Sequence, residues 1–211
     1  KYREWLERQV AKANIEVRLN TEVTPELVKQ IRPDKLIAAV GADPVTPPIP
    51  GIENAINIMD FYRKGMQTTG EADIVIGGGF AGVECAIGLG QEGKKVTVIE
   101  MTDNIASGPN VPYPGTGAMQ VDALWFHVNK NKVDERLNTK CVEVVDGGVI
   151  CETKDGQKLE LKASTIIFAG GMKPREEVVD ALRESVIDFS WVGDCYAPGL
   201  IRTAVEQGFN A

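Results

Sequence analysis

The stretch IVIGGGFAGVECAIGLGQEGKKVTVIE, residues 74–100, decides the fold of this chain. An apolar run at 73–77 leads through a glycine-rich turn into a helical pattern at 80–92, and a second apolar run follows at 95–100. Two buried parallel strands joined through a helix are the repeating unit of dinucleotide-binding α/β sheets. The stretch therefore predicts an α/β fold with a Rossmann-like, three-layer dinucleotide-binding domain.

The glycine turn Gly77-Gly78-Gly79-Phe80-Ala81-Gly82 has the spacing G-x-G-x-x-G. Gly77 allows the tight turn, Gly79 lets the backbone approach a pyrophosphate, and Gly82 lets the helix pack against the strands. The helix N-terminus offers free amide groups and a positive dipole end to the diphosphate. We predict all six residues to be cofactor-binding. A purely structural turn is the alternative, but the flanking strand, helix and acid supply the context that the motif requires.

The second apolar run ends in an acid, Glu100. In this fold a carboxylate at that place accepts hydrogen bonds from the adenosine ribose hydroxyls and repels a 2′-phosphate. The residues that follow, 101–103, include no Arg or Lys that could pair with such a phosphate. The sequence therefore favours NAD(H) as the cofactor and leaves NADP(H) as the alternative. Lys94 and Lys95 stand at the opposite end of the strand and are expected to be solvated charges.

Composition excludes several classes of partner. The 211 residues carry a formal net charge of −7, whereas nucleic-acid and anionic-membrane surfaces need a basic patch. The sequence holds no apolar run of about 18 residues that could span a membrane. The cysteines have no C-x-x-C spacing, so we expect no redox dithiol, no zinc, iron–sulfur or other metal site, and a reduced, cytoplasmic protein. The four cysteines are Cys85, Cys141, Cys151 and Cys195.

Further elements are expected on both sides of the glycine stretch. Thr24-Pro25-Glu26 is typical of a helix start, and the proline-rich segment 41–51 predicts a rigid extended linker. Turn signals at Gly147-Gly148 and Asp155-Gly156 predict an antiparallel meander. Strands are expected at 15–20, 35–41, 139–145, 148–153, 157–162, 164–171 and 191–194, and helices at 2–13, 24–30, 59–64, 118–129 and from 200; the segment 103–117 reads as a long loop.

Four ordered motifs carry a family resemblance. They are AVGADPVTPPIPG (39–51), the glycine turn with Glu84, FAGGMKPR (168–175) and VGDCYAPGLIRTAVEQGFNA (192–211). Together they resemble the C-terminal part of the NADH:flavin oxidoreductases of the old yellow enzyme type, whose fold is similar to that of the pyridine nucleotide-disulfide oxidoreductases. This group includes 2,4-dienoyl-CoA reductases, enoate reductases and trimethylamine dehydrogenase.

The resemblance implies an NAD(P)H-binding domain inserted into an FAD-binding domain. Residues 1–68 would then be the first segment of a partial FAD-type domain with its linker, residues 69–170 the NAD(P)H-binding domain, and residues 171–211 the return segment. Glu84 matches a residue near the nicotinamide, and Asp194 matches an FAD-binding residue. Gly170, in the second crossing between the domains, is also expected to bind cofactor.

The same resemblance points to parts that this sequence lacks. Complete members carry an FAD-binding glycine turn of their own, an FMN-binding barrel and a 4Fe-4S cysteine cluster upstream. Since the chain has no initiator Met and begins within a helical pattern, we expect it to be a piece of a larger oxidoreductase. Alone, it is expected to bind FAD weakly or not at all and to be inactive.

No catalytic constellation emerges from the sequence. The single histidine, His127, has no acidic or cysteine neighbour, and Cys195 has no resolving cysteine nearby. We assign no catalytic residue, because in flavoproteins the cofactors carry the chemistry: the family implies hydride transfer from NADH to FAD, then to FMN and an enoate-type substrate. Two alternatives remain, an electron-transfer reductase subunit (of the glutamate synthase small-subunit or ferredoxin reductase type) and a binding-only domain.

Overall fold

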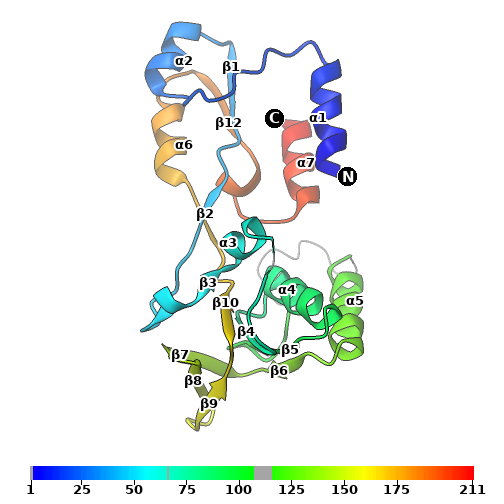
Figure 1. Ribbon diagram of the computed structural model, residues 1–211. Helices are drawn as coiled ribbons and strands as arrows, with labels where there is room; N and C mark the ends of the chain where they lie inside the picture. Colours follow the sequence, from blue (N-terminus) through cyan, green and yellow to red (C-terminus); the bar gives the residue numbers. More distant parts are fainter. Residues whose placement is uncertain (1, 66, 107–115) are drawn as a thin grey trace.

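The computed structural model describes the backbone of residues 2–65, 67–106 and 116–211, and the side chains of the same residues except 116–120. The chain forms two parts that are joined by a narrow connector (Figure 1). We call the part with the five-stranded sheet, residues 49–170, the sheet lobe. The part with strands β1 and β12, residues 2–41 and 175–211, is the pair lobe.

The sheet lobe is built on five parallel strands. Their order is β3 (Ile56–Asn57), β10 (Thr165–Phe168), β4 (Ala72–Ile76), β5 (Lys95–Ile99) and β6 (Asp134–Arg136). The predicted strand–helix–strand unit is therefore β4, α4 (Phe80–Gln91) and β5, at the centre of the sheet. This arrangement confirms the α/β, Rossmann-like prediction.

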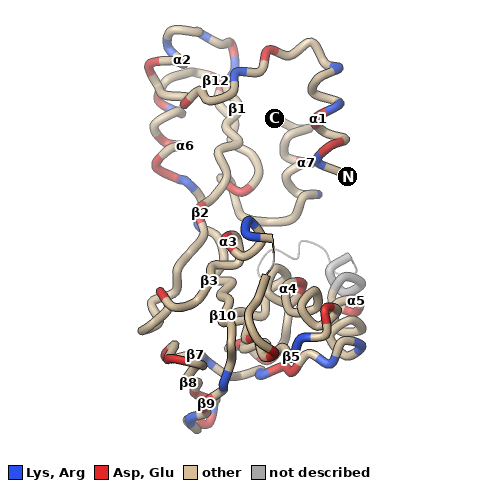
Figure 2. The backbone as a smooth tube through the Cα atoms, in the orientation of Figure 1, with Lys and Arg blue, Asp and Glu red and all other residues tan. Residues whose placement is uncertain are grey.

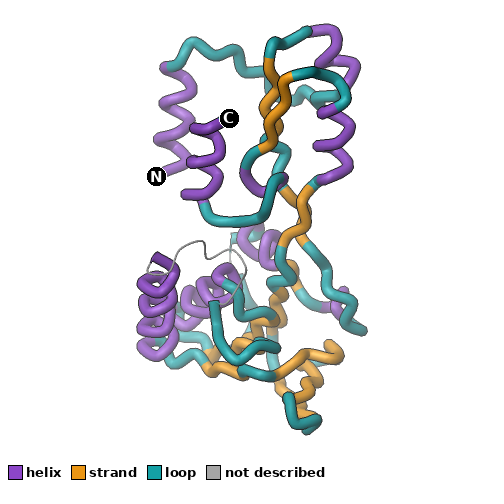
Figure 3. Tube along the Cα trace, turned by 180° about the vertical axis from the view of Figure 1, so that it is seen from behind, coloured by secondary structure: helices purple, strands orange, loops and turns teal. Residues whose placement is uncertain are grey.

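Each face of the sheet is covered by a different layer, because alternate side chains of a strand point to opposite faces. Val75 packs with residues of α3 (Ile58–Arg63), α4 and α5 (Thr116–Lys130). Its neighbours Ile74 and Ile76 pack instead with the antiparallel strands β7 (Thr139–Val145), β8 (Gly148–Thr153) and β9 (Lys158–Lys162). Figure 3 shows the helices and this meander on opposite sides of the sheet. The predicted meander is confirmed.

The connector is a second, very short ladder. Strand β2 (Ala42–Pro44) pairs antiparallel with β11 (Met172–Pro174). Beside it, the Arg175 guanidinium donates from Nε and Nη2 to Asp43 Oδ1, at 2.9 and 2.6 Å. The proline-rich segment expected to be a linker thus begins with a paired strand, and after a 3₁₀ turn (η1, Ile52–Asn54) it enters the sheet lobe.

The pair lobe has a small core. Strands β1 (Lys35–Ala38) and β12 (Asp188–Trp191) pair in parallel, and α2 (Pro25–Ile31) and α6 (Glu176–Arg183) pack beside them. The predicted start of α2 is confirmed, since Thr24 Oγ1 accepts from Leu27 N. The helices α1 (Tyr2–Lys12) and α7 (Ile201–Asn210) bury no residue.

Three strand predictions in this lobe were wrong. Residues 15–20 form no strand: no neighbouring strand pairs with them in the described structure, and Ile15, Val17 and Leu19 are exposed. The strand at 35–41 ends at Ala38 and is buried only there, because β12 alone pairs with it among the described residues. The strand placed at 191–194 spans 188–191 instead, and residues 193–195 form the 3₁₀ turn η2. Most of the predicted loop at 103–117 lies outside the described residues.

Charges are spread over both lobes, with Lys and Arg interspersed among Asp and Glu (Figure 2). None of the helices within the described residues is long and apolar enough to cross a membrane.

Candidate functional site

The turn between β4 and α4 is closed by contacts that only glycines permit. The backbone of Gly77 has a φ of +106°, in the region that favours glycine, and its amide donates to the carbonyl oxygen of Ile99 at 2.9 Å. A Cβ on Gly77 would lie 2.6 Å from the Ala169 carbonyl oxygen, and a Cβ on Gly82 would overlap the carbonyl oxygen of Gly77. The helix therefore starts in direct contact with the turn, as the fingerprint predicts.

Gly79 lies in the middle of the fingerprint and is the N-cap of α4. It makes no side-chain cap hydrogen bond, and no atom of the described residues lies within 4 Å of where a Cβ on it would stand. Phe80 is half-buried and Ala81 is exposed. The first amides of a helix have no carbonyl partner within it. The turn thus offers a cradle without side chains and uncapped N–H groups, which suits the phosphates of a dinucleotide.

Glu100 is fixed beside this cradle. Its Oε2 accepts a hydrogen bond from Gly78 N at 2.7 Å, and its Oε1 accepts one from Thr102 N at 2.8 Å. The side chain is half-buried. The structure therefore brings the predicted acid, 22 residues away from Gly78 in sequence, onto the glycine turn itself.

Backbone hydrogen bonds from both sides hold Glu100 in place. Its amide donates to the carbonyl oxygen of Arg136 on β6, and its own carbonyl oxygen accepts from Thr139 N on β7, both at 2.9 Å. Sequence reasoning did not place Arg136 near the acid, because the two are far apart in the chain. Its guanidinium is engaged by Asp134 Oδ2 at 2.8 Å. This ion pair lies at the surface, with 44% and 48% of the Arg136 and Asp134 side chains exposed.

The other three predicted binding residues lie in different surroundings. Glu84 is exposed on α4, two residues after the last glycine of the fingerprint. Gly170 follows β10, and a Cβ on it would overlap the carbonyl oxygen of Val45 and press on Pro47, so the close approach of the connector accounts for a glycine there. Asp194 lies in η2 of the pair lobe, where its Oδ1 accepts from Gly199 N at 3.1 Å.

Beside Glu84, Tyr62 on α3 lies close to Cys85 on α4. Tyr62 is 42% exposed. Its partial burial, with smaller contributions from the neighbouring Cys85 and Glu84, raises the pKa of Tyr62 to about 12. Burial likewise raises the pKa of the Cys85 thiol to about 11. Both groups are therefore neutral near pH 7, and neither a phenolate nor a thiolate is available at this place.

His127 and Cys195 are placed as packing residues. The His127 ring packs edge-on against Phe126. The Cys195 thiol is buried and donates to the carbonyl oxygens of Val192 and Ala38 at 3.2 and 3.4 Å. Neither side chain touches the glycine turn or Glu100 through any hydrogen bond of the described structure.

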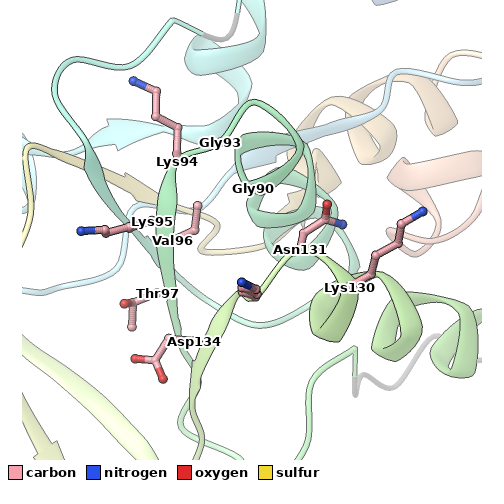
Figure 4. A pocket seen from close by; sticks show the side chains of 10 residues that line it. Gly90, Gly93, Lys94, Lys95, Val96, Thr97, Lys130, Asn131 and Asp134 are labelled. Carbon is pink, nitrogen blue, oxygen red and sulfur yellow. The ribbon is translucent and has the colours of Figure 1, made fainter.

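A cavity of about 520 Å³ lies at the opposite end of the sheet from the glycine turn. It is bordered by the start of β5 and by the ends of α4 and α5. Its lysines do not converge: Figure 4 shows Lys94, Lys95 and Lys130 pointing away in different directions. Lys94 Nζ donates to the carbonyl oxygen of Gly70 at 2.6 Å. Since diverging charges do not form a binding site, this cavity stands apart from the candidate site.

Comparison with known proteins fits this geometry. The family model of the pyridine nucleotide-disulphide oxidoreductases matches residues 25–208. An NADH oxidase of Thermoanaerobacter brockii is 32% identical over 99% of this chain and 32% of its own length. A cinnamate reductase of Clostridium sporogenes is 26% identical over 98% of this chain and 30% of its own length. A solved structure of a 2-naphthoyl-CoA reductase superposes with a TM-score of 0.79 at 26% identity, over 97% of this chain and 30% of that one. The chain thus spans about a third of the length of these relatives.

Proposed function

We propose that this chain, which belongs to the pyridine nucleotide-disulphide oxidoreductase family, is the NADH-binding part of a multidomain flavin oxidoreductase. The family consists of oxidoreductases that bind NAD(P)H and FAD. The proposal assigns residues 69–170 to the NAD(P)H-binding domain, and residues 1–68 and 171–211 to two segments of an FAD-type domain.

The observation that carries the proposal is the contact between Glu100 and the glycine turn. The carboxylate lies on Gly78 N, so a dinucleotide whose pyrophosphate meets the first turn of α4 has its adenosine ribose within reach of this acid. Ribose hydroxyls can donate to the carboxylate, whereas a 2′-phosphate is repelled by it. Arg136 does not bear on this preference, because its bond to Asp134 is an exposed surface pair made through Nε. The carboxylate of Glu100 is the feature that favours NADH.

The nicotinamide end of the cofactor is assigned to the side of α4 that carries Glu84, which is exposed there beside Tyr62. When bound, NADH supplies the hydride that the flavin accepts. The residues of this chain position the dinucleotide and supply no acid or base. In the pair lobe, Asp194 is proposed to contact FAD through Oδ2, because its Oδ1 is already used by Gly199 N.

The finer family assignment, to the old yellow enzyme type with an FMN barrel upstream, also belongs to the proposal. Two of the relatives support it: one is named for cinnamate, an acid with a conjugated C=C bond, and one for an aromatic CoA thioester. We propose an activated C=C bond of this kind as the substrate of the whole protein, with electrons passing from NADH through FAD and FMN.

Calorimetric titration of the chain with NADH and with NADPH tests the cofactor assignment. We expect NADH to bind at least about tenfold more tightly, because juxtaposed like charges cost more than about 1.4 kcal/mol. In Glu100→Gln, which keeps an acceptor for Gly78 N, NADH should bind about tenfold more weakly and the preference should shrink. Glu152→Gln, at an exposed position near the end of β8, is the matched control. Tighter binding of NADPH by the unchanged protein would refute the assignment.

The alternative functions differ in whether the chain oxidises NADH. A binding-only domain, or a fragment that holds FAD weakly, should bind NADH but fail to reduce a dye acceptor, with or without added FAD. Stoichiometric FAD that stays bound through purification, together with dye reduction, would instead support an electron-transfer reductase subunit. We expect binding without oxidation.

A further inference from the structure

Two of the four cysteines face each other in the meander. Cys141 on β7 and Cys151 on β8 are directly opposed in the antiparallel register, and their exposed fractions are 3% and 0%. Both side chains point into the cluster between the meander and the sheet. Cys85 and Cys195 are equally buried, at 2% and 3%, but lie on α4 and in η2. The described structure therefore contains one pair of opposed thiols, and Cys85 and Cys195 serve as buried comparison thiols in the oxidation experiment below.

The two opposed thiols influence each other's ionisation. Cys141 Sγ donates to the carbonyl oxygen of Glu143 at 3.6 Å. The interaction with the Cys151 thiol lowers the pKa of Cys141, and the same interaction together with burial raises the pKa of Cys151. Cys141 is thus the sulfur that ionises first, and Cys151 is the protonated neighbour.

The backbone next to Cys141 can adjust. The register shifts between Cys141 and Glu143, which leaves Val142 as a bulge, and bulges locally disrupt the ladder. Side chains directly opposed on antiparallel strands have Cβ atoms about 4.5–5.5 Å apart. A disulfide needs about 3.5–4.5 Å. Closing the remaining gap requires a shift of about 1 Å, and the bulge is where such a shift is least costly.

We propose that Cys141 and Cys151 form a modification site, a reversible cross-strand disulfide generated by peroxide. The Cys141 thiolate attacks one peroxide oxygen, the O–O bond breaks, and the products are Cys141 sulfenic acid and hydroxide, which takes up the proton that the Cys141 thiol released. The Cys151 sulfur then attacks the sulfenic sulfur, the S–S bond forms, and the hydroxyl leaves with the Cys151 proton as water. Two thiols and one peroxide give one disulfide and two waters.

The absence of solvent exposure sets the expected rate. The peroxide must reach Cys141 through a local opening of the β7–β8 hairpin, so the reaction should be slower than that of an exposed thiol and should speed up as mild denaturant opens the meander. Once formed, the bond should be as buried as the thiols are now, and a dithiol reductant should reverse it through the same opening.

The test is thiol counting by mass spectrometry on the whole native chain. After exposure to hydrogen peroxide, followed by alkylation in denaturant, we expect two of the four thiols to escape alkylation and the mass before alkylation to fall by two hydrogens. Peptide mapping should link residue 141 to residue 151, and dithiothreitol should restore all four thiols. This readout does not depend on dinucleotide binding, so it stands or falls separately from the proposed function.

Variants sharpen the test. Cys141→Ser and Cys151→Ser should each abolish the loss of two thiols, whereas Cys85→Ser and Cys195→Ser should keep it. The unsubstituted protein gives the decisive result even where a variant fails to fold. Four alkylated thiols after native oxidation, a link between other cysteines, or sulfinic acid without any link would overturn the proposal.

Discussion

The sheet lobe and the pair lobe differ in how far they bury the faces of their strands. In the sheet lobe five parallel strands are covered by helices on one face and by the meander on the other, and Val75, Val83, Val149 and Ile167 have no exposed surface. The described part of the pair lobe has five buried apolar residues around two strands: Val28, Ala38, Val179, Leu182 and Cys195. The two lobes therefore differ in how completely helices and other strands cover their sheets.

The extent to which the strands are covered determines how much each lobe contributes to the free energy of unfolding. Burial of apolar surface is the dominant favourable term in folding, and two-stranded sheets are marginal without further packing. In the pair lobe several large apolar side chains remain exposed, Trp5, Leu19, Ile201 and Phe209 among them. We infer that the free energy of unfolding resides mainly in the sheet lobe, and that the dinucleotide cradle belongs to the more stable part.

The largest expected effect is a core truncation in the sheet lobe. Phe61 on α3 is 1% exposed, and Phe61→Ala should lower the free energy of unfolding by about 3–5 kcal/mol. Trp5→Ala, on a helix without buried residues, should change it by no more than about 0.5 kcal/mol. Urea unfolding followed by circular dichroism measures both. Equal decreases in the free energy of unfolding for the two substitutions would contradict the inference that stability resides mainly in the sheet lobe.

A smaller effect is expected within one helix of the sheet lobe. Gly82→Ala places a Cβ against the Gly77 carbonyl oxygen; it should cost about 1–3 kcal/mol and weaken NADH binding, since the turn must shift. Gly88→Ala, on the same helix, meets no atom within 4 Å. It should stabilise the protein by roughly 0.5–1 kcal/mol because alanine favours the helix. Thermal unfolding and NADH titration distinguish the two, and a Gly82→Ala protein with normal affinity would contradict the geometry.

The smallest of these effects concerns a buried acid in the sheet lobe. Asp73 on β4 is 1% exposed, and its carboxylate oxygens have no hydrogen-bond partner among the described residues. Burial raises the pKa of Asp73 above its ordinary value of 3.8, and the nearby Thr68 hydroxyl and Lys94 only partly oppose this. Asp73→Asn removes the buried charge and should stabilise the protein on the order of 1 kcal/mol at pH 7. Asp122→Asn, at an exposed position, is the control.

The pH dependence follows from the sign of that shift. Above pH 3.8 the unfolded chain releases this proton first while the folded protein still holds it. The contribution of Asp73 to stability is therefore fully present below that pH, and it is lost as the pH rises through the raised folded-state pKa. Between pH 4 and 7, the free energy of unfolding measured with urea should fall less steeply with rising pH in Asp73→Asn than in the unsubstituted protein. An identical pH dependence in the two proteins would contradict a raised pKa.

Sequence could predict the elements whose signals are local. The strand, glycine turn, helix and acid of residues 73–100 meet all the conditions of the dinucleotide motif, and the structure adds the bond from Gly78 N to Glu100. Spacing alone would have misled: Gly88-Leu89-Gly90-Gln91-Glu92-Gly93 also reads G-x-G-x-x-G, but it lies in the second half of α4 and the turn after it. The preceding strand, the following helix and the acid at the end of the second strand distinguish the true motif from this second match.

Sequence could not predict features that depend on distant partners. The alternating pattern at 15–20 suits a strand, but a strand needs a neighbour, and none pairs with it in the described structure. The burial of Asp73 without a hydrogen-bond partner among the described residues depends on how strands far apart in sequence are packed, whereas the pairing of Arg136 with Asp134 is local to β6. The Cys141–Cys151 pair is intermediate. The predicted hairpin brings the two strands together, but a regular register would pair Cys151 with Val142, and the bulge puts Cys141 opposite Cys151.

Hydrogen exchange of the backbone amides, with and without saturating NADH, tests the central claim most directly. We predict that NADH slows exchange at residues 78–83 and 100–102, and that β1 and β12 exchange faster than β4 and β10 in both states. Protection centred on residues 188–199 around Asp194, or no change at the glycine turn, would contradict the placement of the cofactor at Gly77–Gly82 and Glu100.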